Sequence, residues 1–224
     1  MYREIVESGR STVLRLNSSS ELAISIDIKS STHILLINGT NFRSNDINEQ
    51  DLIIHPLNHY LIINQGKDPL KIEYNKDIST HQVIYDPYKY EISEKVNLKP
   101  DFFIKRYQIP TDHIDTLPKW YSFKFTYSDY NLIFVRPDCG LSIQFHKIRT
   151  EFWEVLDGRP IILNGNKVFY NVDSGTKFQT RVNTYHTIIN PNRDTDDFVI
   201  VKERWEGEFD ENDIVRVFNP NHYY

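Results

Sequence analysis

Short runs of apolar and β-branched residues recur along the chain, separated by turn-forming residues. Residues 22–28 (LAISIDI) alternate apolar and polar positions, as expected of a strand with one buried face. Clusters of Ser, Asn, Asp and Gly break the runs. The predicted strands cover residues 12–16, 22–28, 33–37, 51–55, 60–63 and 70–74. We therefore predict an antiparallel β-sandwich-like domain over residues 1–80.

The pattern becomes tighter from Trp120 onward. Asn164-Gly165 stands between two apolar runs, which is among the strongest short signals for a β-hairpin. The predicted strands cover residues 121–127, 132–135, 141–148, 152–156, 160–163, 167–170, 178–182, 185–189 and 198–203. Strands at this spacing indicate a jelly-roll β-barrel over residues 118–224.

The stretch between these two regions has a different character. Residues 81–117 repeat Tyr and Pro with little periodicity, as in YDPYKY and LKPD. Because exposed aromatic rings are unfavourable, we expect a connector that packs along a surface, not a flexible tether. The prediction is thus an all-β chain of two domains joined by a Tyr/Pro-rich connector.

Composition supports the β assignment and narrows the function. The 224 residues include 14 Tyr and 13 Phe, whereas Ala23 is the only alanine, and alanine is the best helix former. The same bias is typical of an AT-rich genome, such as that of a virus. The net charge is −5 and the basic residues are scattered, so we expect no nucleic-acid partner. The single cysteine, Cys139, excludes an internal disulfide.

The apolar runs are also too short to span a membrane, and the first residues lack the apolar core of a signal peptide. The sequence therefore predicts no membrane partner and a cytoplasmic protein, or a virion protein if the chain has a structural role.

Candidate chemistry concentrates in residues 140–158 (GLSIQFHKIRTEFWEVLDG). Gln144 and His146 are two apart, so on a strand their side chains share a face. Glu151 follows after a short gap, and His186 lies in another strand-like run. Two imidazoles, one carboxylate and one amide oxygen can form the ligand shell of a divalent metal.

These motifs resemble a known family. The segment from Gln144 through His146 and Glu151 to Gly158 is similar to the first cupin motif, with Gln in place of its first His. LSIQFH, RTEFW, HTIIN and ENDIVR, in this order, resemble the cupin domain of type II mannose-6-phosphate isomerases over residues 118–224. The resemblance implies a Zn²⁺-like metal held by Gln144, His146, Glu151 and His186.

The same resemblance implies an aldose–ketose isomerase that interconverts mannose 6-phosphate and fructose 6-phosphate. The expected ligand is thus a sugar phosphate or another carbohydrate. In such an enzyme the metal binds sugar oxygens while a base moves a proton between C1 and C2. Arg149 and Glu151 are the candidate catalytic residues, although they could instead form a structural ion pair.

The chain departs from the family at several positions. Ile148 stands where many relatives have a second histidine, and Thr187 stands where an arginine usually follows the second-motif histidine. The loss of that arginine weakens the case for a phosphosugar. An alternative therefore stays open: a non-catalytic cupin used for binding or assembly, for instance in a viral particle. Either reading is compatible with a homo-oligomer or a larger protein assembly.

Overall fold

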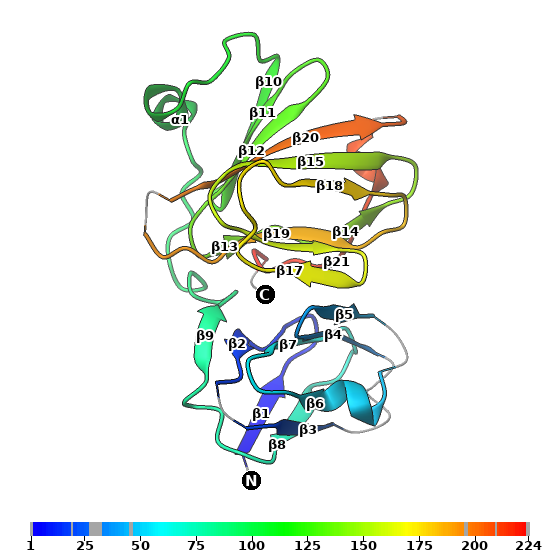
Figure 1. Cartoon of the computed structure of the whole chain (residues 1–224). Helices are drawn as coiled ribbons and strands as arrows, with labels where there is room; N and C mark the ends of the chain where they lie inside the picture. Colours follow the sequence, from blue (N-terminus) through cyan, green and yellow to red (C-terminus); the bar gives the residue numbers. More distant parts are fainter. Residues whose placement is uncertain are drawn as a thin grey trace. The chain divides into compact units, whose positions relative to one another are not determined.

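The computed structural model describes residues 2–18, 20–26, 33–44, 47–194, 197–208 and 210–222. Residues 27 and 28, which end one of the predicted strands, lie outside these ranges. The chain divides into two compact units: unit 1 comprises residues 1–88 and 166–168, and unit 2 comprises residues 89–165 and 169–224. Almost all of the regular structure is β, which confirms the predicted fold class (Figure 1).

Unit 1 contains two antiparallel sheets. One has the strand order β1-β8-β3-β6, and the other includes β5-β4-β7-β2-β9. Alternating side chains such as Leu22 and Ile24 of β3, and Ile34 and Leu36 of β4, form its core. The elements are β1 (Tyr2–Val6), β2 (Leu14–Leu16), β3 (Leu22–Ile26), β4 (Ile34–Asn38), β5 (Asn41–Arg43), the 3₁₀-helix η2 (Glu49–Leu52), β6 (Ile53–Ile54), β7 (His59–Asn64), β8 (Leu70–Tyr74) and β9 (Gln82–Tyr85).

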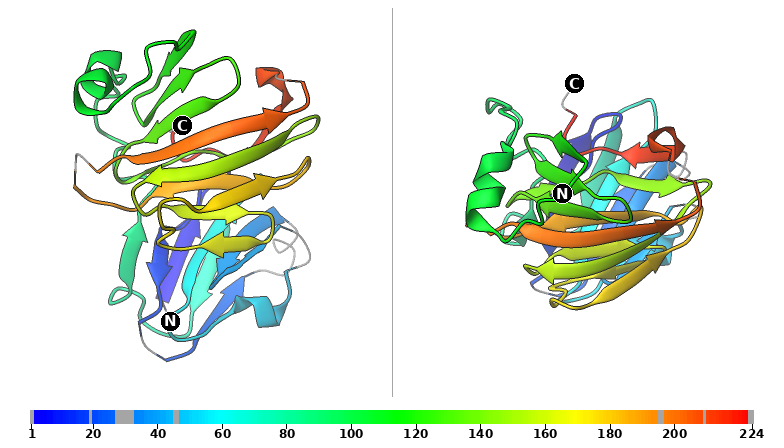
Figure 2. Two further views of the ribbon diagram at one scale, coloured as in Figure 1. Left: turned by 45° about the horizontal axis from the view of Figure 1, so that its top comes forward. Right: turned by 90° about the horizontal axis from the view of Figure 1, so that it is seen from above.

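Unit 2 contains the second pair of curled antiparallel sheets, seen from two sides in Figure 2. One has the order β10-β11-β12-β20-β15-β18, and the other includes β21-β14-β19-β16, with β13 also pairing with β19. The elements are α1 (Pro100–Arg106), β10 (Asp115–Pro118), β11 (Ser122–Thr126), β12 (Asn131–Val135), β13 (Cys139–Gly140), β14 (Ile143–His146), β15 (Thr150–Asp157), β16 (Ile161–Asn164), β18 (Lys177–Thr180), β19 (His186–Asn190), β20 (Val199–Glu206), the 3₁₀-helix η3 (Glu211–Asp213) and β21 (Ile214–Phe218). Strand β17 (Lys167–Phe169) is divided, with its first two residues in unit 1 and its last in unit 2.

The turn expected at Asn164-Gly165 lies between β16 and β17. Gly165 has a φ of +66°, a backbone conformation that favours glycine. Gly158, which ends the segment similar to the first cupin motif, has a φ of +82°. A Cβ at this position would lie 2.9 Å from Val199 Cγ2. Gly158 is therefore needed both for its conformation and for the close approach of β20.

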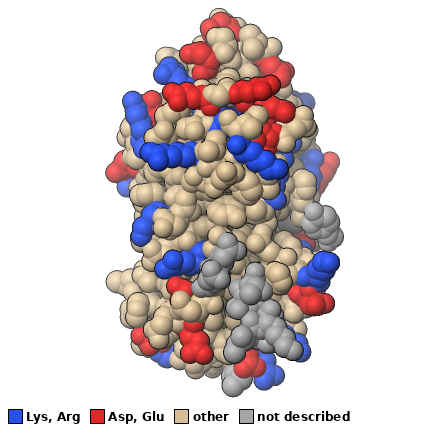
Figure 3. Space-filling model, turned by 90° about the vertical axis from the view of Figure 1, so that its right-hand side faces the viewer, with Lys and Arg blue, Asp and Glu red and all other residues tan. Residues whose placement is uncertain are grey.

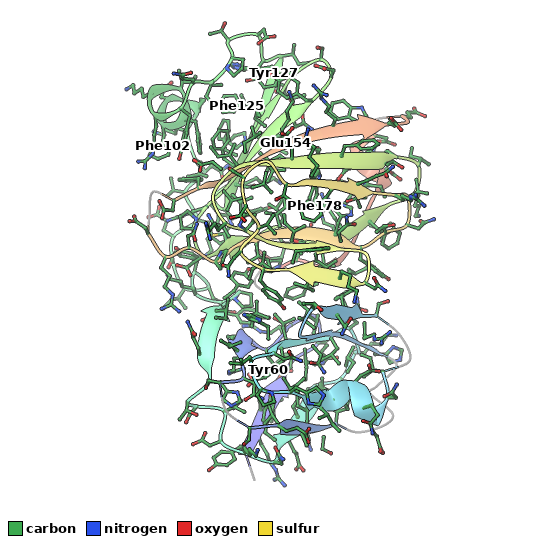
Figure 4. The ribbon with its side chains drawn as sticks, in the orientation of Figure 1. Tyr60, Phe102, Phe125, Tyr127, Glu154 and Phe178 are labelled. Carbon is green, nitrogen blue, oxygen red and sulfur yellow. The ribbon has the colours of Figure 1, made fainter. Side chains whose placement is uncertain are left out.

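Strand β12 (NLIFV) is buried at every position because its two faces meet different layers. Ile133 and Val135 face the interior between the sheets, whereas Leu132 and Phe134 face outward. Helix α1 covers this outer face through Phe103, which is fully buried. Phe102 and Phe125 mark this aromatic layer in Figure 4.

The sequence pattern did not predict helix α1, which lies inside the expected connector over residues 81–117. Its local signals are Pro100 at the first turn and Asp101 beside it. The helix has only seven residues, too few to show an apolar period. No helix in the described ranges is long and apolar enough to cross a membrane.

Charged side chains of both signs occur on the face of the protein shown in Figure 3. On the face shown in Figure 3, Lys and Arg lie among Asp and Glu, without one sign covering the face. This agrees with the scattered basic residues of the sequence.

Candidate metal centre

Three predicted ligands meet inside unit 2. His146 ends β14, Glu151 is the second residue of β15, and His186 begins β19. Their ligand atoms all lie within 4.8 Å of one another. The side chains are 1%, 1% and 0% exposed, so the cluster is shielded from bulk water. Strand alternation places them there: the inward positions of β15 after Glu151 are Trp153 and Val155, which belong to the core.

His186 presents a lone pair to Glu151. Its Nδ1 lies 2.9 Å from the carbonyl oxygen of Thr184, which can only accept, so Nδ1 carries the proton. Nε2 is then an electron-pair donor, and it faces Glu151 Oε2 at 3.5 Å. Oε2 is buried and has no hydrogen-bond partner within the described part of the chain. Two electron-rich atoms thus face each other with no proton between them, and a cation would remove this repulsion.

His146 completes the cluster from the other side. Its Nε2 lies 2.8 Å from Glu151 Oε1, and its Nδ1 lies 3.5 Å from Asp213 Oδ2. Asp213 also accepts hydrogen bonds from the backbone N–H groups of Lys147 (2.7 Å) and Ile148 (3.2 Å). His146 Nδ1 has no hydrogen-bond partner among the described residues, and Nε2 forms the hydrogen bond to Glu151 Oε1. Metal binding through Nε2 would require its proton to move to Nδ1, on the side of Asp213. Carboxylates in this position orient metal-binding histidines.

Arg149 is part of the same cluster. Its guanidinium is 3% exposed and donates through Nε to Glu151 Oε1 at 3.1 Å and through Nη1 to the carbonyl oxygen of Asp210 at 2.8 Å. Nη2 lies 3.4 Å from His146 Nε2. The pairing of Arg149 with Glu151, anticipated from the sequence as one alternative, is therefore present and lies directly against the three ligand residues.

Gln144 is close to the cluster but turned differently. Its Nε2 lies 3.4 Å from His186 Nε2, while its Oε1 accepts a hydrogen bond from Ser142 Oγ at 2.8 Å. The amide oxygen, which is the metal-ligating atom, therefore points away from the cluster. A half-turn of the amide group brings that oxygen to face His186.

The electrostatics favour the protonation states that a metal requires. Burial alone would raise the pKa of Glu151, but the hydrogen bond from His146 and the charges of His186, His146 and Arg149 lower it overall. Burial lowers the pKa of His186, outweighing the opposite effect of Glu151. An ionised carboxylate and a neutral imidazole are the forms that bind metal.

The residues present therefore fit a divalent cation. Two imidazole nitrogens and one carboxylate form a donor set common in zinc sites. A cation could bind between Glu151 Oε2, which has no hydrogen-bond partner in the described part of the chain, and the lone pair of His186 Nε2.

The cluster opens into a cavity of about 470 Å³ within unit 2. Besides Glu151 and His186, its lining includes Lys119, Lys124, Arg216 and Glu203. The sequence analysis did not identify Glu203. Val199, Val201 and Glu203 alternate along β20, and a carboxylate continuing an inward apolar series is the signal that could have revealed it.

Comparison with known proteins supports the family assignment of this part of the chain. Residues 110–219 match the family model described as mannose-6-phosphate isomerase C-terminal. The resemblance of the C-terminal half to the cupin domain of these isomerases is therefore confirmed. No curated protein matches the chain.

Several solved structures are similar at low scores. A cupin-superfamily sugar phosphate isomerase from Silicibacter pomeroyi is 15% identical over 39% of this chain and 60% of its own, with a TM-score of 0.34. A putative sugar phosphate isomerase from Acidithiobacillus ferrooxidans is 15% identical over 40% of this chain and 52% of its own, with a TM-score of 0.32. The matches span less than two thirds of either protein.

The match to an oxalate decarboxylase formate complex from Lactobacillus farciminis is longer. It covers 96% of this chain and 78% of that one, at 7% identity and a TM-score of 0.39. Scores this low carry no inference about function.

Proposed function

We propose that the chain is a metal-dependent, sugar-phosphate isomerase-like cupin that interconverts an aldose phosphate and a ketose phosphate. The observation that carries the proposal is the buried His146–Glu151–His186 cluster, in which a lone pair of His186 faces the unpaired Glu151 Oε2. The family match over residues 110–219 supports the substrate class.

His146, Glu151 and His186 would hold the metal, with Gln144 as a fourth ligand after its amide turns. Zn²⁺ suits the two imidazoles and one carboxylate. When bound, such an ion polarises a sugar carbonyl and stabilises the negative charge that develops on its oxygen. Mannose 6-phosphate is the substrate that the family match makes the first to test.

Neighbouring residues position the proposed metal ligands. Arg149 fixes the carboxylate of Glu151 through Oε1 and leaves Oε2 directed at His186. Asp213 holds the backbone that follows His146 and so orients the imidazole.

Basic residues at other positions can supply the positive charge that is lost where Thr187 replaces the family's arginine. Lys119, Lys124 and Arg216 line the cavity, and they come from the segment before β11, from β11 and from β21. Three positive groups can neutralise a phosphate, which carries close to two negative charges at neutral pH. A phosphosugar thus has counter-charges in this cavity despite the substitution.

A coupled assay tests this proposal. Metal-free protein is reloaded with Zn²⁺ and supplied with mannose 6-phosphate, and formation of fructose 6-phosphate is followed. We expect turnover in the loaded wild type and its loss in His186→Ala. A loaded wild type that converts no hexose phosphate, or activity indifferent to His186→Ala, contradicts the proposal.

No described residue and no comparison favours the alternative of a viral-particle or structural protein. Assembly into a homo-oligomer and a cytoplasmic location stay predictions, and light scattering tests the first of them.

A further inference from the structure

Glu203 is a buried carboxylate in the same cavity as the metal cluster. On β20 it lies opposite Trp153 of β15 and opposite Asn131 of β12. Its side chain is buried, and it lines the cavity together with Glu151, Arg149 and His186. The carboxylate therefore occupies the wall formed by the β10-β11-β12-β20-β15-β18 sheet.

The hydrogen-bond partners of Glu203 are neutral. Asn131 Nδ2 donates to Oε1 at 2.7 Å, and Trp153 Nε1 donates to Oε2 at 3.2 Å. Within the described ranges, no Lys, Arg or His nitrogen forms an ion pair with it. This differs from Glu151, which accepts from Arg149 and lies against two imidazoles. Glu203 and Glu151, both in the cavity wall, thus have opposite environments, an arrangement typical of groups with different roles in proton transfer.

Burial raises the pKa of Glu203, and the charge of Glu151 raises it further. The hydrogen bond from Asn131 and the charges of Lys124 on β11 and Arg149 before β15 act in the opposite direction. The net shift brings the pKa to about 7. A carboxyl group that gains and loses its proton near neutral pH suits acid–base catalysis.

We propose that Glu203 is the catalytic residue that carries the proton between C1 and C2 of the sugar. This assignment rests on the proposed isomerase function. It is carried by the position of Glu203 in the cavity wall, by its two neutral donors and by the absence of an ion pair. Glu151 is a poor candidate because Arg149 holds its Oε1 and the metal would take its Oε2.

The proton transfer balances without any further reagent. In the aldose-to-ketose direction, the Glu203 carboxylate takes the proton from C2, and the C–H electron pair forms the C1–C2 double bond. The carbonyl oxygen on C1 takes a proton from solvent, which gives an enediol. The hydroxyl on C2 then loses its proton to solvent as its carbonyl forms, and C1 receives the proton held by Glu203. The carboxylate is regenerated, and no oxidant or reductant takes part.

Glu203→Gln is the variant that tests the assignment, because the amide keeps the size and one acceptor oxygen. Glu154→Gln is its matched control. Glu154 lies on β15 but faces the other side of the sheet, where it pairs with Lys177 at 3.7 Å (Figure 4). Each full-length protein is loaded with Zn²⁺ and incubated with mannose 6-phosphate in deuterated water, and deuterium entry at C1 and C2 is followed by NMR.

We expect Glu203→Gln to lower isotope exchange and turnover by at least ~100-fold, within the range for loss of a general acid–base group. Metal content and the calorimetric affinity for mannose 6-phosphate should stay within a few-fold of wild type, and Glu154→Gln should match wild type throughout. In Glu203→Ala, added formate should restore part of the exchange, which a purely structural carboxylate would not allow.

The failures of the two proposals are distinguishable. Exchange retained within a few-fold in Glu203→Gln, or no rescue of Glu203→Ala by formate, overturns the role of Glu203 and leaves the isomerase intact. A loaded wild type with neither exchange nor turnover overturns the proposed function and this assignment together.

Discussion

Asp213→Ala should weaken both the fold of unit 2 and the metal site. Asp213 is 7% exposed, and its Oδ1 accepts from the N–H groups of Lys147 and Ile148. A hydrogen bond to a charged group contributes about 1.5–3 kcal/mol. Loss of the two bonds should therefore lower the free energy of unfolding by about 3 kcal/mol, allowing for partial rehydration of the amides.

The second effect concerns His146, whose Nδ1 lies 3.5 Å from Asp213 Oδ2. Removal of a carboxylate that orients a ligating histidine typically costs ~10–100-fold in metal affinity. We expect a loss in this range for Zn²⁺.

Urea unfolding followed by tryptophan fluorescence measures the first effect. All three tryptophans, Trp120, Trp153 and Trp205, belong to unit 2, so the signal reports on that unit. Competition with a chelating dye on the folded protein measures the second effect.

The matched control is Asn212→Ala, an exposed position in the same 3₁₀-turn, for which we expect a change within about 0.5 kcal/mol. The reasoning is refuted if Asp213→Ala changes stability by less than about 1 kcal/mol and leaves the Zn²⁺ affinity unchanged.

Three further predictions follow from packing and burial. Phe103→Ala should destabilise unit 2 by about 3–5 kcal/mol in urea unfolding, since its ring is fully buried against the sheet; a loss below about 1 kcal/mol contradicts this packing. Gly207→Ala should cost about 2 kcal/mol, because φ is +103° and the new Cβ would lie 2.7 Å from the carbonyl oxygen of Ile148; an unchanged midpoint contradicts the strain. Burial raises the pKa of the Cys139 thiol to about 12, so Ellman's reagent should react at pH 8 only after unfolding, and rapid labelling of native protein contradicts it.

Strand periodicity predicted one part of the candidate metal cluster. The spacing of Gln144 and His146 places both on one face of β14, and β14 pairs with β19 so that Gln144 lies opposite His186. Glu151 lies outside the strand predicted over residues 152–156 and was a candidate ligand through its residue type and the family resemblance, whereas in the structure it is the second residue of β15 and is buried. The shared face of Gln144 and His146 is a local consequence of the two-residue period of a strand, whereas the pairing of β14 with β19 joins segments that are distant in the chain.

Other parts of the site depend on contacts between distant segments. Glu203 is recognisable as a cavity residue only once β20 lies between β12 and β15. The orientation of the Gln144 amide depends on Ser142, which donates to its oxygen, and on His186, whose Nε2 lies 3.4 Å from its nitrogen. Helix α1 exists because Phe103 fills the outer face of the sheet, and seven residues alone do not specify it.

The most direct test of the account is the metal content of the purified protein. The protein is stripped with a chelator, reloaded with Zn²⁺, freed of excess ion and subjected to elemental analysis, together with His146→Ala and the control His55→Ala. His55 is an exposed histidine of unit 1 and should not matter. The account predicts about one Zn²⁺ per chain in wild type and in His55→Ala, and none in His146→Ala. A wild type that retains no metal, or a His146→Ala protein that binds as much as wild type, would contradict it.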